Sequence, residues 1–84
     1  MAYYVYILYS PHHDRFYIGQ TSDLSTRLTY HNEGECFSTA PYRPWTIVYK
    51  QECNTRAEAM KRERELKAKK SKSYLKWFTK IEEK

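Results

Sequence analysis

A strand-like segment that runs almost directly into a helix constrains the fold of this chain more than any other feature. Phe16–Gly19 reads FYIG, an aromatic and β-branched run that is typical of a strand, and the glycine interrupts it. Ser22 and Asp23 then supply N-cap residue types, and Leu24 and Leu28 follow at helical spacing. Because a sheet and a helix are joined this closely, we expect an α+β fold.

The rest of the chain continues the same alternation. Apolar and aromatic runs predict strands at 3–9, 16–21 and 45–52, and the polar turn between the first two makes them an antiparallel hairpin. Helices are expected from 23 to about 33, from the Thr55–Glu58 capping box to about 69, and from 71 to 81. The order β-β-α-β-α-α predicts one domain over residues 1–84, with a three-stranded, mostly antiparallel sheet and flanking helices.

The two C-terminal helices carry apolar stripes that should face the sheet. Ala59, Met60 and Leu66 form the first stripe, and Glu63 lies in its middle, where a carboxylate is costly unless it is paired or bound to a cation. The last helix should dock through its apolar residues, which are Tyr74, Leu75, Trp77, Phe78 and Ile81.

Composition narrows the cellular setting. No apolar run approaches the roughly 18 residues that cross a bilayer, and the N-terminus has no basic region typical of a signal peptide, so we expect a cytoplasmic protein without a membrane partner. Two cysteines outside any C-x-x-C motif and three histidines give no zinc-binding spacing.

The positive charge is concentrated in the last third of the chain. Residues 1–60 hold five basic and six acidic side chains, whereas residues 61–84 hold ten basic and four acidic ones. Such clustering is typical of nucleic-acid binding, and it is equally typical of a solvated helix face. On the first interpretation the binding residues are Lys61, Arg62, Arg64, Lys67, Lys69, Lys70 and Lys72.

A small set of polar residues is candidate catalytic machinery. Tyr6 and Tyr17 can share a face of the hairpin with Gly19, and Arg27 and His31 lie beside the leucine stripe of the first helix. With Glu63, this set can bind a phosphodiester and a divalent cation and can activate water. Taken singly, each residue also fits a plain role, as a core aromatic, a helix-end histidine or a solvated charge.

Several motifs, in this order, resemble the GIY-YIG endonuclease domain. They are VYIL at 5–8, FYIGQT at 16–21, L-x-x-R-L-x-x-H at 24–31, PYRPWTIVYK at 41–50 and TRAEAMKRERELK at 55–67. Together they cover nearly the whole chain. They are most similar to small stand-alone members related to the N-terminal nuclease of the bacterial excision-repair incision subunit.

The resemblance implies a role for each matching position. Tyr6 would be the general base for the attacking water, Tyr17 would lie beside the scissile phosphate, and Gly19 is the glycine that follows it. Arg27 would stabilise phosphate charge and His31 would polarise a tyrosine hydroxyl. Glu63 would bind a single divalent ion, usually Mg²⁺. A tyrosine base needs a lowered pKa, for which Arg27 or the ion is the expected cause.

The chain also departs from the family pattern. The GIY element reads VYI, Gln20 stands where some members have a lysine, and no clear equivalent of a late asparagine follows Lys69. Two functions therefore stay open: a metal-dependent DNA endonuclease used in repair, and a non-catalytic nucleic-acid-binding module that uses the basic helices. A protein-interaction domain is a third. DNA, branched or single-stranded, is the expected partner, with a separate targeting protein, and the loop from Glu35 to Pro44 should border the site.

Overall fold

Three antiparallel strands form a single sheet in the computed structural model, which describes residues 2–69 and 72–80. The strands are β1 (Tyr3–Ser10), β2 (Arg15–Thr21) and β3 (Thr46–Cys53), and their spatial order is β2-β1-β3. Both pairings are antiparallel, so β1 is the central strand and β2 and β3 form the edges. The predicted α+β class and the order β-β-α-β-α-α are confirmed.

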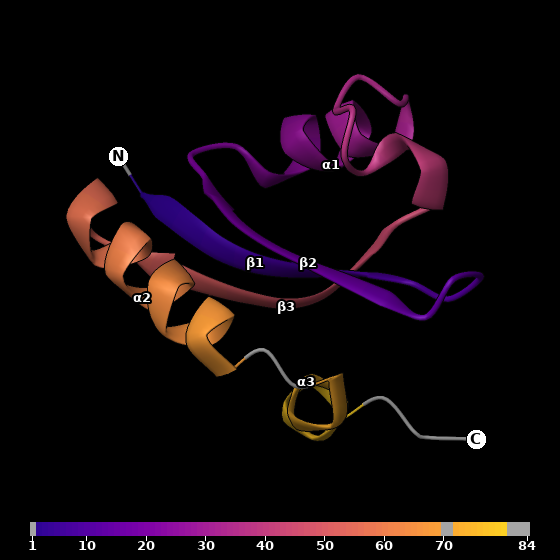
Figure 1. Cartoon of the computed structure of the whole chain (residues 1–84). Coiled ribbons are helices and arrows are strands. Elements are labelled where there is room, and N and C mark those ends of the chain that lie inside the picture. The colour runs from indigo at the N-terminus through magenta and orange to yellow at the C-terminus, as the bar shows by residue number, and fades with distance from the viewer. Residues whose placement is uncertain (1, 70–71, 81–84) are drawn as a thin grey trace.

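The helices lie on opposite sides of this sheet. Figure 1 shows α1 (Leu24–Asn32) above the strands, and α2 (Arg56–Lys69) and α3 (Lys72–Thr79) below them. A short 3₁₀ turn, Ala40–Tyr42, lies in the loop between α1 and β3. The predicted helix start at Ser71 and the docking of Ile81 fall outside the described residues.

Local capping explains where the helices begin and end. The Asp23 carboxylate accepts the Thr26 backbone N–H at 3.2 Å and so caps α1, and Gly34 follows the helix with a φ of 80°, a conformation that favours glycine. The Thr55 hydroxyl accepts the Glu58 N–H at 3.2 Å, which confirms the capping residue predicted for α2.

Alternating side chains of β1 build two separate cores. Val5 and Ile7 point to the α2 and α3 side, where Leu66 and Leu75 are buried with them. Tyr6 and Leu8 point to the α1 side and pack with Trp45, Leu24 and Leu28. The second core is therefore the one that carries the candidate site.

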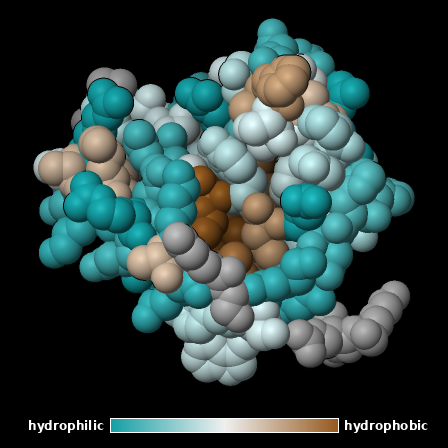
Figure 2. Space-filling view, in the orientation of Figure 1, coloured by the Kyte–Doolittle hydropathy of each residue, from teal (hydrophilic) through white to brown (hydrophobic). Residues whose placement is uncertain are grey.

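Two apolar residues do not dock as the sequence predicts. The side chain of Trp77 is 74% exposed, and Met60 is 44% exposed. α3 instead packs through Leu75, with Tyr74 and Phe78 partly buried beside it. Periodicity marks a helix face, but the width of the buried stripe depends on how closely the sheet approaches. Figure 2 shows the outcome: a mostly hydrophilic surface surrounds a hollow in which apolar side chains gather.

Candidate active site

Tyr6 and Tyr17 meet on one face of the β1–β2 hairpin. In the register of the two strands Tyr6 is opposite Gly19 and Leu8 is opposite Tyr17, so all four share a face. The centroids of the two tyrosine rings are 6.3 Å apart. Tyr6 is buried and Tyr17 is half-buried, so the pair borders the surface.

Gly19 makes room for Tyr6. A Cβ atom at position 19 would lie 2.6 Å from the Tyr6 hydroxyl oxygen and 3.2 Å from the Tyr17 ring. The space that glycine leaves is therefore filled by Tyr6 itself. This is a geometric reason for a glycine two residues after Tyr17.

His31 is buried between the two tyrosines. It projects from the last turn of α1, its Nε2 atom is 3.2 Å from the Tyr6 hydroxyl, and its ring centroid is 4.8 Å from that of Tyr17. Leu24 and Leu28 hold α1 against the sheet and so bring His31 to this place.

Thr39 is the hydrogen-bond partner of the second His31 ring nitrogen. Its hydroxyl donates to the Cys36 carbonyl oxygen at 3.4 Å and lies 2.8 Å from His31 Nδ1. When the single hydroxyl proton is donated to this carbonyl, Thr39 accepts from an Nδ1–H. Nε2 is then the acceptor, and the Tyr6 hydroxyl donates to it.

Sequence reasoning expected the loop from Glu35 to Pro44 to border the site but did not identify Thr39. A single threonine in an irregular loop gives no periodic signal. Its burial at 2% exposure and the Trp45 indole N–H, which donates to the Thr39 carbonyl oxygen at 2.9 Å, are visible only in the fold.

Arg27 brings positive charge to the exposed side of the site. It lies one turn before His31 on α1, with its guanidinium carbon 5.0 Å from the centroid of the Tyr30 ring. Its charge lowers the pKa values of Tyr6, Tyr17 and His31, so the guanidinium lies within electrostatic reach of all three.

Burial dominates the protonation of the central groups. Burial, and then the neighbouring Tyr17, raises the pKa of Tyr6 well above its usual range, and the opposing effect of Arg27 is smaller. Burial, and then Arg27, lowers the pKa of His31. In the free protein Tyr6 is therefore a neutral phenol and His31 a neutral imidazole at pH 7. The expected lowering of the tyrosine pKa is wrong for this state, because burial outweighs the arginine.

Glu63 approaches the tyrosines from the other side of the sheet. It lies on α2, which packs against β2, and its half-buried carboxylate raises the pKa values of both Tyr6 and Tyr17. Lys67, one turn further on, pairs with it at 2.7 Å between Nζ and Oε2. The carboxylate in the apolar stripe is thus paired, as its cost requires.

Comparison with known proteins identifies the arrangement. The family model described as the GIY-YIG catalytic domain matches residues 2–76. The chain belongs to the GIY-YIG family. A solution NMR structure of a UPF0213 protein from Bacillus halodurans is 32% identical, with a TM-score of 0.50 over 81% of this chain and 72% of that one. No curated protein matches the chain.

The GIY-YIG match runs from β1 into α3 and so includes all five candidate residues. The structure brings Tyr6, Tyr17 and His31 into contact and holds Arg27 and Glu63 within electrostatic reach. No helix in the described part of the chain is long and apolar enough to cross a membrane.

The donor chemistry of Glu63 fits the divalent ion that the family implies. Residues 2–69 and 72–80 contain no cluster of three or more His, Cys, Asp or Glu side chains that could enclose a metal. Mg²⁺ does not need such a cluster, because it usually keeps several waters and is held by one or two carboxylates together with substrate phosphates. A single accessible glutamate meets that requirement once Lys67 moves aside.

The basic C-terminal residues are less available than their number indicates. Lys67 pairs with Glu63, and Lys72 pairs with Asp14 at 3.3 Å. Arg62 pairs with Glu65 at 3.4 Å and donates to Gln51. Lys61, Arg64 and Lys69 are exposed, and Lys70 lies outside the described residues. Their binding of nucleic acid stays a prediction.

Proposed function

We propose that this chain is a metal-dependent endonuclease that hydrolyses phosphodiester bonds in DNA. The observation that carries the proposal is the buried Tyr6–His31 hydrogen bond, which lies within electrostatic reach of the exposed Arg27 and the half-buried Glu63. A proton acceptor, a cation for the phosphate and a carboxylate for a metal are the parts that phosphodiester hydrolysis requires.

Tyr6 and His31 act together as the general base. The attacking water forms a bond to phosphorus and gives its proton to the Tyr6 oxygen, while Tyr6 passes its own proton to His31 Nε2. No free tyrosinate forms, so the raised pKa of Tyr6 is compatible with its role. The bond between phosphorus and the leaving oxygen breaks in the same process.

The other residues bind the phosphate. Arg27 offers a planar pair of N–H donors to the phosphate oxygens, and the half-buried Tyr17 offers its hydroxyl at the edge of the site. Glu63 would hold the Mg²⁺ ion, which supplies Lewis-acid stabilisation of charge on the phosphate.

The resemblance to the excision-repair nuclease supports DNA repair in the cytoplasm as the process, with a partner protein that selects the substrate. Duplex, single-stranded and branched DNA are all candidate substrates. A second function, non-catalytic binding on the same fold, is favoured by Gln20 in place of the lysine and by the Lys67 ion pair at Glu63.

Cleavage of labelled duplex, single-stranded and branched DNA, with and without Mg²⁺, tests the proposal. We expect metal-dependent cleavage that Glu63→Gln and Arg27→Gln each reduce by about 100-fold or more, as the loss of a charge-stabilising group does in other enzymes. Arg56→Gln, an exposed change at the start of α2, is the control for loss of positive charge. A folded wild-type protein that binds DNA and cleaves none of the three would establish the binding module instead.

A further inference from the structure

Arg15 lies on the same face as the candidate active site. In the hairpin register it is opposite Ser10, two positions along β2 from Tyr17, so the two side chains point to the same side of the sheet. Two residues of a strand advance about 6.6 Å. Arg15 is therefore the next side chain on this face toward the β1–β2 turn.

A stack of aromatic rings holds the Arg15 guanidinium in place. Its central carbon lies 4.3 Å from the centroid of the Tyr42 ring. Tyr42 in turn meets His13 edge-on at 5.4 Å and Trp45 at 6.5 Å, and Trp45 is 6.5 Å from Tyr17. The rings form a continuous row from Arg15 to the catalytic tyrosine, so the position of the guanidinium is tied to the site.

Arg15 has no carboxylate partner among residues 2–69 and 72–80 and its side chain is exposed. This sets it apart from the nearby basic side chains of α3, because Lys72 and Lys76 both pair with Asp14. An arginine that is held by a ring and not by an acid keeps all its N–H donors for a ligand.

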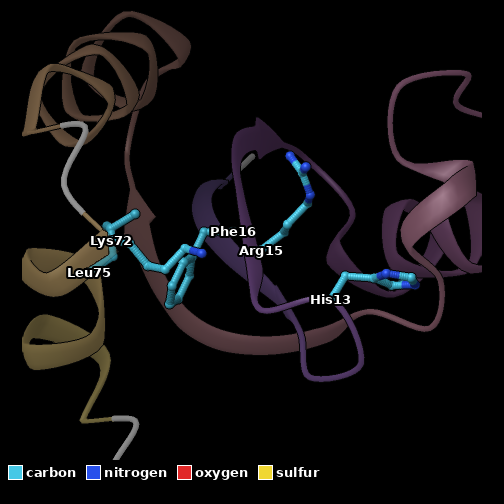
Figure 3. Close-up of a pocket in the computed structure, with 5 residues that line it drawn as sticks. All are labelled: His13, Arg15, Phe16, Lys72 and Leu75. Carbon is cyan, nitrogen blue, oxygen red and sulfur yellow. The ribbon is translucent and has the colours of Figure 1, made fainter. Parts of the chain in front are cut away.

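A hollow of about 350 Å³ lies at this end of β2. Figure 3 shows Phe16 pointing toward Lys72 and Leu75 of α3, and Arg15 and His13 extending away from that helix. No acidic residue lines the hollow. Two cationic side chains thus flank the open edge of the sheet, Arg15 on the face of the site and Lys72, paired with Asp14, on the α3 face.

A second hollow, also about 350 Å³, involves the other end of the same edge strand. Gln20 of β2 lines it together with Glu63, Arg64 and Lys67 of α2. Arg15 and Gln20 are five residues apart, about 17 Å along an extended strand. That length accommodates several consecutive phosphates of one nucleic-acid strand.

We propose that Arg15, with His13 beside it on the Tyr42 ring, forms a binding subsite for a backbone phosphate of the DNA strand beside the phosphate that is cleaved. The subsite rests on the proposed nuclease function and extends it. The bound strand runs along the open edge of β2, from the Glu63 end past Tyr17 to the turn. Arg15 contacts a non-reacting phosphate and so contributes to affinity, not to the chemical step.

The test is binding of a fluorescein-labelled single-stranded DNA, followed by fluorescence anisotropy in EDTA, which prevents metal-dependent cleavage. A series of KCl concentrations gives the salt dependence of the affinity. Arg15→Gln should bind about threefold to tenfold more weakly, and the slope of log K against log salt should become shallower by about 0.7, the value for one phosphate contact of a single strand. Arg56→Gln at the start of α2 should change neither quantity.

A purely structural role of Arg15 would give a different result. If Arg15 only clamps the Ala40–Tyr42 turn, Arg15→Gln and Tyr42→Leu would lower the melting temperature alike and leave the salt slope unchanged, which would overturn the subsite. Arg15→Lys keeps the charge and should keep the slope.

The failure of the subsite can be told apart from failure of the nuclease proposal. A wild-type protein that binds DNA, next to an Arg15→Gln variant with the same affinity and slope, overturns the subsite alone. A folded wild-type protein that binds no DNA overturns both.

Discussion

At the scale of single residues, the site depends on one chain of hydrogen bonds. In the tautomer with the proton on Nδ1, Tyr6 donates to His31, His31 donates to Thr39, and Thr39 donates to the Cys36 carbonyl oxygen. The last bond favours this direction, because a backbone carbonyl can only accept. A residue that touches no substrate therefore decides whether His31 can receive a proton from Tyr6.

Thr39→Val should slow cleavage by removing the acceptor for His31 Nδ1–H. Without it the imidazole can turn or adopt the other tautomer, and we expect the single-turnover rate to fall about 10-fold to 100-fold, as when a histidine loses its orienting partner in a metal site. Thr39→Ser keeps the hydroxyl and should restore most of the rate. Equal rates for the valine and serine variants, both folded, would show that Thr39 does not position His31.

The burial of His31 should make the fold sensitive to mild acid. Because burial lowers its pKa in the folded chain, the unfolded chain binds a proton more readily once the pH falls below about 6.5. Above that pH the burial of His31 costs the free energy of unfolding nothing. As the pH falls toward the lowered pKa, the free energy of unfolding decreases by at most about 1.4 kcal/mol per pH unit. Urea denaturation at about pH 7 and pH 5 should show a smaller loss for His31→Gln than for wild type.

At the scale of elements, the hairpin and α1 bring the site together by close approach. Because Gly19 has no side chain, the Tyr6 ring can pack directly against the backbone of β2. Gly34 has a positive φ and follows the end of α1, before the loop that contains Thr39. A glycine is thus required at position 19 for space and at position 34 for a left-handed backbone conformation.

Gly19→Ala should therefore lower both the cleavage rate and the stability, whereas Gly34→Ala should lower the stability alone. The new methyl group at position 19 would press on the buried Tyr6 ring, so we expect a loss of about 1–3 kcal/mol in the free energy of unfolding, together with a fall in cleavage rate. Gly34→Ala forces a left-handed alanine against Arg43 and should cost about 1–2 kcal/mol while largely sparing the rate. A Gly19→Ala variant with wild-type activity would contradict the space argument.

At the scale of the whole molecule, local patterns predicted the elements, and the fold decided which of their residues face the site. Strand and helix signals gave the correct order, and resemblance selected Tyr6, Tyr17, Arg27, His31 and Glu63, which the structure places near one another. Thr39 and Arg15 were missed because their importance comes from tertiary neighbours, namely His31 and Tyr42. Net charge alone also gave no sign that Lys67 and Lys72 are paired, or that Arg15 has no carboxylate partner among residues 2–69 and 72–80.

The whole account depends on Tyr6 as the group that receives the proton of the attacking water. The most direct test is the single-turnover cleavage rate of Tyr6→Phe in Mg²⁺, on whichever DNA the wild type cleaves, with matched melting temperatures and with Arg56→Gln as control. This change removes one oxygen atom and keeps the buried ring. We predict a rate at least about 100-fold below wild type, as expected for loss of a general base. A folded Tyr6→Phe protein that cleaves within about threefold of the wild-type rate would contradict the account.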